Sequence, residues 1–190
     1  METSISNFIT NMNVKKSVNN KIFYDYIKFI NDKKNEAKDK KDDKELMGRL
    51  DKEVKAYQKK LVGENKDLLV GKLINMSIDP IIPENIMKND TLRYKYFKAH
   101  YWDNIDLSDK RLVHYPAFKN KLQFYFEKML LQQADTICAN AHSLIEQIEN
   151  GSEMFKYVVH FITYKYETSK IMGMDAVFYC MADSYYCPAD

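Results

Sequence analysis

The sequence predicts an all-α fold, an irregular array of about nine amphipathic helices, and three observations indicate it. Apolar residues make up 45% of the 190 residues and aromatic residues 13%, which is enough for a hydrophobic core. Only five glycines and four prolines interrupt the chain, too few for the many hairpins of an all-β fold. Apolar residues recur at helical spacing along the chain, without the fixed repeat length of a regular solenoid.

The first third of the chain contains three predicted helices. Their apolar stripes are, in chain order, Ile5, Phe8, Ile9 and Met12; Ile22, Phe23, Tyr26, Ile27 and Ile30; and Leu46, Met47, Leu50, Val54, Tyr57 and Leu61. Thr3 or Ser4 is a candidate cap for the first helix, and Gly63 is a candidate stop for the third. Residues 32–45 hold six lysines and six acidic residues, which indicates a solvated linker or an exposed helix face.

The middle of the chain combines two shorter predicted helices with two breaks. Leu68, Leu69, Leu73 and Ile74 indicate a helix that ends before Pro80 and Pro83, because proline cannot continue a helix. A hinge or an extended crossing is expected there. Asn89 or Asp90 can cap the next helix, over 91–102, in which Leu92, Tyr96 and Ala99 share a face. Residues 103–116 have turn-forming residues and no clean period, and we expect an ordered loop.

Regular helical spacing returns in the last third of the chain. The four predicted stripes are Phe118, Leu122, Phe126 and Met129; Ile137, Ala141, Leu144, Ile145 and Ile148; Phe155, Val158, Val159, Ile162 and Tyr166; and Ile171, Met174, Phe178, Met181 and Tyr185. Asn150 and Gly151 end the second of these helices, and Ser152 is a candidate cap for the third. The last helix is expected to stop before Pro188.

Charge and hydropathy exclude two classes of partner. A formal net charge of +2 provides no strong field, so we expect no nucleic acid as a partner. No run of apolar residues approaches the ~20 that a membrane-spanning helix needs, so we expect no membrane insertion by this segment. The N-terminus lacks both the basic start and the apolar core of a signal peptide.

The cysteines and histidines do not form a recognisable motif. Cys138, Cys180 and Cys187 lack C-x-x-C spacing, and Cys180 and Cys187 would lie roughly 10.5 Å apart along one helix, beyond the reach of a disulfide. Buried or incidental thiols are therefore expected, with neither a disulfide framework nor a redox pair. The four histidines never occur in H-x-x-x-H or H-E-x-x-H spacing, and no metal site or cofactor is expected.

No phosphate-binding loop or nucleophile elbow is present, so no catalytic residue is expected. The segment richest in unusual residues is 94–106, which contains the only tryptophan. Its aromatic residues could anchor a protein-binding surface or stack on single-stranded nucleic acid, while the simpler interpretation places Tyr96, Phe97 and Trp102 in the core or at its rim. The candidate binding residues are Tyr94, Tyr101, Trp102, Asp103, Asp106 and Arg111.

Three phrases in residues 90–190 carry a resemblance to a known family: RYKYFKAHYWDNIDLSDKRLVHYPAFKNKLQFYFEKML, QQADTI and SEMFKYVVHFITYKYETSKIMGMDAVFYCMADSYY. This half resembles a helical domain of unknown function found upstream of a thioredoxin-like domain in exported thiol-disulfide oxidoreductases of Gram-negative gut bacteria. HYWDNIDLSD and KIMGMDAVF are its most specific parts. Residues 1–88 resemble the variable helical lead-in of those proteins, through helix order and the break at Pro80 and Pro83.

The resemblance implies a downstream thioredoxin-like domain with a C-x-x-C motif, often a small β-rich domain upstream, and a place in the cell envelope or periplasm. Neither extra domain lies in this sequence, so we expect a fragment that ends near Asp190, where a linker to the redox domain would begin. The resemblance also implies no catalytic residue within the helical domain. We expect one helical domain over 1–190, with a lysine-rich lead-in over 1–88 and a family-like core over 89–190.

The expected function is that of a non-catalytic accessory domain. It would position, shield or select partners for the thioredoxin-like domain of the same polypeptide, and protein substrates are further expected partners. The alternative is a free-standing helical module that binds a protein or peptide through the aromatic segment 94–102. An enzyme in its own right would need a pocket that gathers two or more of His100, His114, Asp103 and Asp106.

Overall fold

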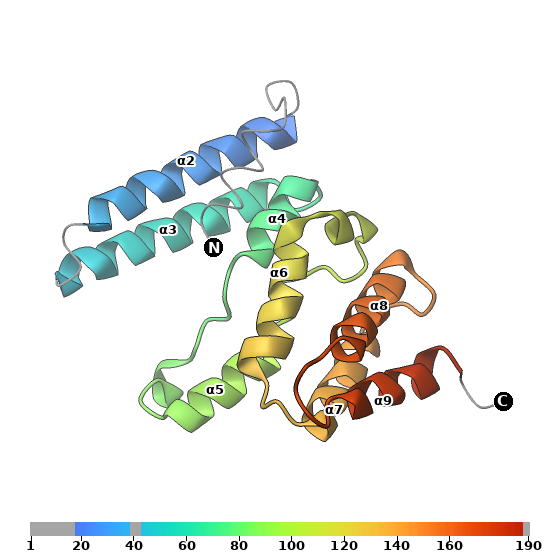
Figure 1. Cartoon of the computed structure of the whole chain (residues 1–190). Coiled ribbons are helices and arrows are strands. Elements are labelled where there is room, and N and C mark those ends of the chain that lie inside the picture. Colours follow the sequence, from blue (N-terminus) through green and yellow to red (C-terminus); the bar gives the residue numbers. More distant parts are fainter. Residues whose placement is uncertain (1–17, 39–42, 188–190) are drawn as a thin grey trace. The chain divides into compact units, whose positions relative to one another are not determined.

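The computed structural model describes residues 18–38 and 43–187, and the helix expected near Thr3 or Ser4 lies outside these residues. The described part is all helical, with eight α-helices and no strand, so the predicted fold class is confirmed and the expected number of helices is close. The chain divides into two compact units, Met1–Ile81 and Ile82–Asp190. Figure 1 shows the helices of each unit.

Unit 1 contains two long helices and one short helix: α2 (Val18–Lys38), α3 (Lys44–Glu64) and α4 (Leu69–Met76) (Figure 1). All three helices contact one another. Their apolar faces meet in a cluster of four buried residues, Tyr26, Leu61, Val70 and Ile74. Partly buried side chains pack around it, all of them from the predicted stripes except Val62: Ile22, Phe23, Ile27, Ile30, Tyr57 and Val62. The predicted stripes of α2 and α3 therefore supply most of this core, whereas for α4 the predicted Leu68 is exposed and Val70, outside the predicted stripe, is buried.

The charged stretch between α2 and α3 belongs largely to the helices themselves. Its described residues, 32–38 and 43–45, continue α2 or begin α3, which agrees with an exposed helix face. Asp43 caps α3, because its Oδ1 accepts a hydrogen bond of 2.9 Å from the backbone N–H of Leu46. Helix α3 extends one residue past Gly63 and is capped by Asn65.

Unit 2 contains five α-helices: α5 (Asp90–Ala99), α6 (Pro116–Phe124), α7 (Ala134–Ile145), α8 (Glu153–Glu167) and α9 (Asp175–Tyr185). Short 3-10 helices cover Glu84–Ile86 and Lys110–His114, and a π-helix over Tyr125–Met129 continues α6. Helices α7, α8 and α9 contact one another. Two predicted caps are confirmed, Asn89 for α5 and Ser152 for α8.

The core of unit 2 is larger than that of unit 1 and more aromatic. Fully enclosed side chains come from α6 to α9 and from the segment before them: Leu112, Phe118, Leu122, Phe126, Ile137, Ala141, Val158, Ile162, Val177 and Met181. Tyr166 donates a hydrogen bond of 3.2 Å to the carbonyl of Phe126, which ties α8 to the π-helix. Burial raises the pKa of Tyr166, so its hydroxyl stays a donor at neutral pH.

Two details of unit 2 differ from the periodicity of the sequence. The predicted apolar face of α5 is not buried, since Leu92 and Ala99 are exposed. Helix α9 begins at Asp175 rather than at Ile171. Gly173 has a φ of +82°, which lies outside the helical region, so the helix starts only after it. Among the described residues, no helix has the length and apolar character needed to cross a membrane.

Candidate functional site

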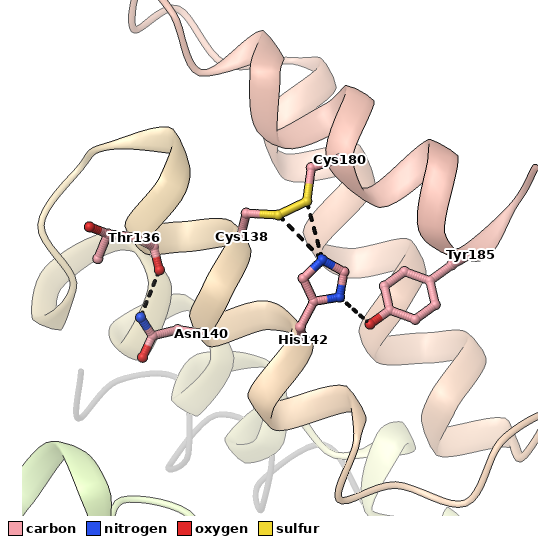
Figure 2. The surroundings of a disulfide bond; sticks show 6 residues. All are labelled: Thr136, Cys138, Asn140, His142, Cys180 and Tyr185. Atoms are coloured by element: carbon pink, nitrogen blue, oxygen red, sulfur yellow. Dashed lines mark hydrogen bonds between the residues drawn. A yellow bond between two sulfur atoms is a disulfide. The ribbon is translucent and has the colours of Figure 1, made fainter. Parts of the chain in front are cut away.

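A disulfide bond between Cys138 and Cys180 joins α7 to α9 in unit 2 (Figure 2). The two cysteines are 42 residues apart in sequence, and their Cα atoms are 6.6 Å apart. This spacing lies within the range that disulfides span. His142 stands four residues after Cys138 on α7, so both side chains project from the same face of the helix.

The imidazole of His142 contacts both sulfur atoms. Its Nε2 lies 3.4 Å from the Sγ of Cys138 and 3.3 Å from the Sγ of Cys180. Its Nδ1 lies 2.7 Å from the hydroxyl oxygen of Tyr185, on α9 (Figure 2). The imidazole therefore connects the sulfur pair on one side with a phenol on the other. We call Cys138, His142, Cys180 and Tyr185 the α7–α9 cluster.

Tyr185 is held beside the histidine by ring contacts. The rings of His142 and Tyr185 are 5.4 Å apart, and Phe155 of α8 meets Tyr185 edge to face at 5.8 Å. Burial, with a smaller contribution from the charge of Glu146, raises the pKa of Tyr185 above its ordinary value. The phenol therefore stays protonated at neutral pH and can donate or accept a hydrogen bond at Nδ1.

The packing of α7 and α9 fixes the position of the cluster. Ile137 and Ala141 flank Cys138 and His142 on α7 and are fully buried, as are Val177 and Met181 on α9. Asn140 adds a polar connection, because its Oδ1 accepts a hydrogen bond of 3.1 Å from the hydroxyl of Tyr125. The three ligand-type residues Cys138, His142 and Cys180 are themselves half-buried. They are therefore held by a packed scaffold and still reachable from solvent.

The expectation of unpaired, incidental thiols is wrong for Cys138 and Cys180. It compared only Cys180 with Cys187, which lie close in sequence, whereas the bond forms between residues of two helices that pack side by side. Helix packing brings together cysteines whose sequence separation gives no hint of contact. Cys187 is exposed and remains a free thiol.

The α7–α9 cluster also contains a set of side chains that could hold a metal ion. Within the described residues, one ligand atom each from Cys138, His142 and Cys180 lies within 4.8 Å of the other two. Thiolate sulfur and imidazole nitrogen are the ligands that zinc prefers. Histidine–histidine spacing does not reveal this set. The signal in the sequence is the C-x-x-x-H spacing of Cys138 and His142, which places both ligands on one helix face.

Two of the six predicted binding residues lie in the core. Tyr101 and Trp102 are 3% and 7% exposed, so neither side chain is offered to a partner. The rings of Tyr101, Trp102 and Tyr125 lie about 5 Å from one another. The ammonium group of Lys121 lies 4.7 Å from the centre of the Tyr101 ring. The aromatic residues at this point stabilise the fold, which is the simpler of the two interpretations.

The other four predicted binding residues have partners within unit 2. Tyr94 is 45% exposed and donates a hydrogen bond of 2.7 Å to the carbonyl of Met129. Asp103 lies 2.6 Å from Nδ1 of His100. Asp106 accepts hydrogen bonds from the backbone and hydroxyl of Ser108.

Arg111 completes this set and is paired with a neighbour. Its guanidinium forms a two-pronged ion pair with the buried Asp109, with distances of 2.8 and 2.6 Å. The hydrogen bonds that the Arg111 guanidinium donates to Asp109 raise the pKa of Arg111. Asp103, Asp106 and Arg111 thus each have a partner close by in sequence, and this accounts for their presence in the loop after α5.

Comparison with known proteins supplies a family. The chain matches no curated protein and no solved structure. A family model described as a domain of unknown function, DUF5106, matches residues 35–189, which include α3, all of unit 2's helices and the α7–α9 cluster. Since the match covers most of the sequence, the chain belongs to the DUF5106 family.

Proposed function

We propose that this chain is a non-catalytic helical accessory domain of a larger cell-envelope protein, where it positions or selects partners for a thioredoxin-like thiol-disulfide oxidoreductase domain of the same polypeptide. The proposal rests on the resemblance carried by residues 90–190. Two features of unit 2 support it. The first is that the phrase KIMGMDAVF includes exposed apolar side chains as well as buried ones, and the second is the disulfide bond.

The phrase KIMGMDAVF, residues 170–178, contains both buried and exposed apolar residues. Met174 and Val177 are 2% and 0% exposed, and packing accounts for them. Ile171 and Met172 are 53% and 98% exposed, in the turn before α9, and packing does not account for them. Contiguous exposed apolar surface is typical of sites that contact another protein, and Ile171 and Met172 are adjacent in the chain. This turn is the structural observation that best supports the proposal, as the place where a partner domain would bind.

By contrast, the phrase HYWDNIDLSD, residues 100–109, is explained by the fold itself. Tyr101, Trp102, Ile105 and Asp109 are all buried. The alternative function, a free-standing module that binds a protein or peptide through residues 94–102, therefore retains only Tyr94 as a large exposed aromatic side chain. The accessory role has more support.

The disulfide supports the proposed compartment. Disulfides persist in oxidising environments such as the bacterial periplasm and are rare in the cytosol. The bond between Cys138 and Cys180 is therefore in keeping with an exported protein. Mass spectrometry of the protein taken from cells with thiols blocked at lysis tests this point. We expect Cys138 and Cys180 to be linked and Cys187 to be blocked.

The experiment that tests the function compares three proteins: the complete gene product, the same product without residues 1–190, and residues 1–190 alone. We expect residues 1–190 to show no turnover of a disulfide substrate, and their deletion to change the rate or substrate choice of the remainder. Turnover by residues 1–190 alone would show that they are not an accessory domain. A gene product without a redox domain, or one unaffected by the deletion, would contradict the proposal.

A matched pair of variants tests the turn before α9. Met172→Ser in the complete gene product removes the most exposed apolar side chain of the turn. Ile81→Ser is the control, because Ile81 is 79% exposed but lies outside residues 90–190, which carry the resemblance. We expect Met172→Ser, and not Ile81→Ser, to reproduce part of the effect of the deletion.

A further inference from the structure

We propose that Cys138, His142 and Cys180 bind one zinc ion when their disulfide is reduced, and that the disulfide is the metal-free form of the same site. The inference rests on the α7–α9 cluster alone and does not depend on the accessory function. A disulfide that only braces two helices has no need of an imidazole nitrogen directed at both sulfur atoms. A metal site needs such a nitrogen.

The positions of the ligand atoms suit zinc with little movement. In a tetrahedral site, bond lengths of about 2.3 Å to sulfur and 2.0 Å to nitrogen place a sulfur and a nitrogen ligand roughly 3.5 Å apart. Nε2 of His142 already lies 3.4 and 3.3 Å from the two sulfur atoms. The imidazole is therefore at ligand spacing from both cysteines before any metal binds.

Only the sulfur atoms have to separate. Two thiolates on one tetrahedral zinc ion lie roughly 3.8 Å apart, against about 2.05 Å in a disulfide. Breaking the S–S bond allows this separation by rotation about the Cα–Cβ bonds. The Cα atoms of Cys138 and Cys180, 6.6 Å apart, can stay where the packing of α7 and α9 holds them.

Tyr185 supplies the supporting hydrogen bond that zinc-binding histidines commonly have. When Nε2 binds the metal, Nδ1 carries the ring proton, and this N–H donates a hydrogen bond to the hydroxyl oxygen of Tyr185, 2.7 Å away. This bond fixes both the tautomer of His142 and the direction of its Nε2 lone pair. Tyr185 is thus a positioning residue that acts through the histidine.

Three protein ligands leave the fourth position of a tetrahedral zinc ion open. The three ligand residues are half-buried, so water can reach this position. Zinc sites with three protein ligands and one water differ from the closed, four-ligand sites that serve structure alone. The expected species is a zinc ion with two thiolates, one imidazole and one exchangeable water.

The two forms interconvert by thiol–disulfide exchange. A dithiol reduces Cys138–Cys180: the S–S bond breaks, two electrons and two protons pass to the cysteines, and the dithiol becomes a disulfide. Zinc then displaces the two thiol protons and binds the thiolates. Oxidation by a second disulfide re-forms the Cys138–Cys180 bond and releases zinc; the second disulfide takes up the two electrons, and two protons from water, to become two thiols.

The first test is a titration of the purified chain with zinc chloride in its two redox states. The reduced chain is freed of reductant under anaerobic conditions, and binding is measured by calorimetry. We expect one zinc ion per reduced chain and none per oxidised chain. Cobalt(II) in place of zinc should give the absorption bands of a tetrahedral thiolate site. Absence of saturable binding to the reduced chain would overturn the proposal.

Variants separate the α7–α9 cluster from adventitious thiol binding. Cys138→Ser and Cys180→Ser should each weaken binding by at least about tenfold, whereas Cys187→Ser, which removes the exposed free thiol, should leave it unchanged. Tyr185→Phe keeps all three ligands and should weaken binding by about 10–100-fold, as loss of a supporting hydrogen bond does. Equal effects of the three cysteine variants would contradict the assignment.

A measurement on the unaltered chain guards against variants that fail to fold. Zinc bound at the cluster should slow alkylation of Cys138 and Cys180 by N-ethylmaleimide, while Cys187 reacts at its former rate. Mass spectrometry of the modified peptides reports each rate separately. Protection of Cys138 and Cys180 alone would support the site, and equal rates with and without zinc would exclude it.

Discussion

The two units of the molecule stabilise their helices in different ways. Unit 1 has two helices of 21 residues, α2 and α3, that meet over a core cluster of four buried residues and carry charged side chains on their other faces. Unit 2 has helices of 9 to 15 residues that enclose a larger aromatic core, and a disulfide joins two of them. The stability of unit 1 comes mainly from the apolar stripe of each helix, which the periodicity of the sequence defines. Unit 2 depends more on contacts between residues far apart in sequence.

The largest expected effect is the loss of a core side chain in unit 2. Phe126 is fully buried, and Phe126→Ala should lower the free energy of unfolding of unit 2 by about 3–5 kcal/mol. Trp102 is the only tryptophan and is buried in this unit, so its fluorescence reports on the unfolding of unit 2. Urea titration followed by this fluorescence should show an earlier midpoint.

The matched variant in unit 1 is Ile74→Ala, because Ile74 is also fully buried, in the cluster between α2, α3 and α4. Ile74→Ala should lower the free energy of unfolding of unit 1 by about 2–5 kcal/mol. Urea titration followed by the helical circular dichroism signal measures this loss. We expect the variant to leave the midpoint of Trp102 fluorescence unchanged. A common shift of both signals in both variants would show that the two units unfold as one.

The second effect concerns the disulfide, which only unit 2 possesses. Reduction of Cys138–Cys180 opens a loop of 42 residues and should lower the stability of unit 2 by about 2–4 kcal/mol, in the absence of zinc. The measurement is again the urea midpoint followed by Trp102 fluorescence. It is made with and without a phosphine reductant, and a chelator is present in both cases. The Cys138→Ala/Cys180→Ala variant should behave like the reduced chain and should not respond to reductant.

The difference between the units also marks what could be predicted from the sequence. Helices α2, α3 and α4 were predicted from apolar spacing, since stripes such as Tyr57 and Leu61 directly encode the buried face of a helix. Helix caps such as Ser152 could also be predicted, because the hydrogen bond of a cap joins residues only three positions apart. The start of α9 was predicted too early, because the apolar periodicity continues through Gly173. The positive φ of Gly173 is not helical, so α9 begins only after it.

The α7–α9 cluster was beyond the reach of the same reasoning. The pairing of Cys138 with Cys180 depends on which faces of α7 and α9 meet, and local spacing does not contain that information. The aromatic segment shows the same limit, since pattern alone could not decide whether Trp102 was core or surface. The C-x-x-x-H spacing of Cys138 and His142 is present in the sequence and indicates two of the three ligands, but the prediction rested on histidine–histidine and cysteine–cysteine spacing, which does not reveal it.

A smaller effect compares helix caps in the two units. Ser152 accepts a hydrogen bond of 3.1 Å from the backbone N–H of Phe155 in unit 2, and Asp43 does the same for Leu46 in unit 1. Ser152→Ala and Asp43→Ala should each cost about 1 kcal/mol in their own unit. Hydrogen exchange of the first turn of α8 and of α3 measures both. Equal losses would show that capping is local and independent of the type of core.

The smallest effect is electrostatic and belongs to unit 1. Lys33 of α2 lies 2.5 Å from Glu53 of α3, and Arg49 bridges to Glu36 at 2.9 Å. The hydrogen bond from Lys33, assisted by the charges of Lys33 and Arg49, lowers the pKa of Glu53 from its ordinary value of 4.5. All four side chains are partly exposed, so the ion pairs should contribute little at high ionic strength.

The sign of the pH dependence follows from this lowered pKa. A carboxyl group whose pKa is lower in the folded state stabilises that state above its unfolded pKa, and the contribution is lost as the pH falls through the folded value. Unit 1 should therefore lose stability on acidification below about pH 4.5, more strongly in low salt, and Glu53→Gln should flatten this dependence. Urea midpoints from circular dichroism between pH 3 and 7 provide the measurement, with Glu45→Gln, a change at an exposed carboxylate of the same helix, as the control. Parallel curves for the unaltered chain and Glu53→Gln would show that the Lys33–Glu53 contact does not persist in solution, and that unit 1 is held by its apolar cluster alone.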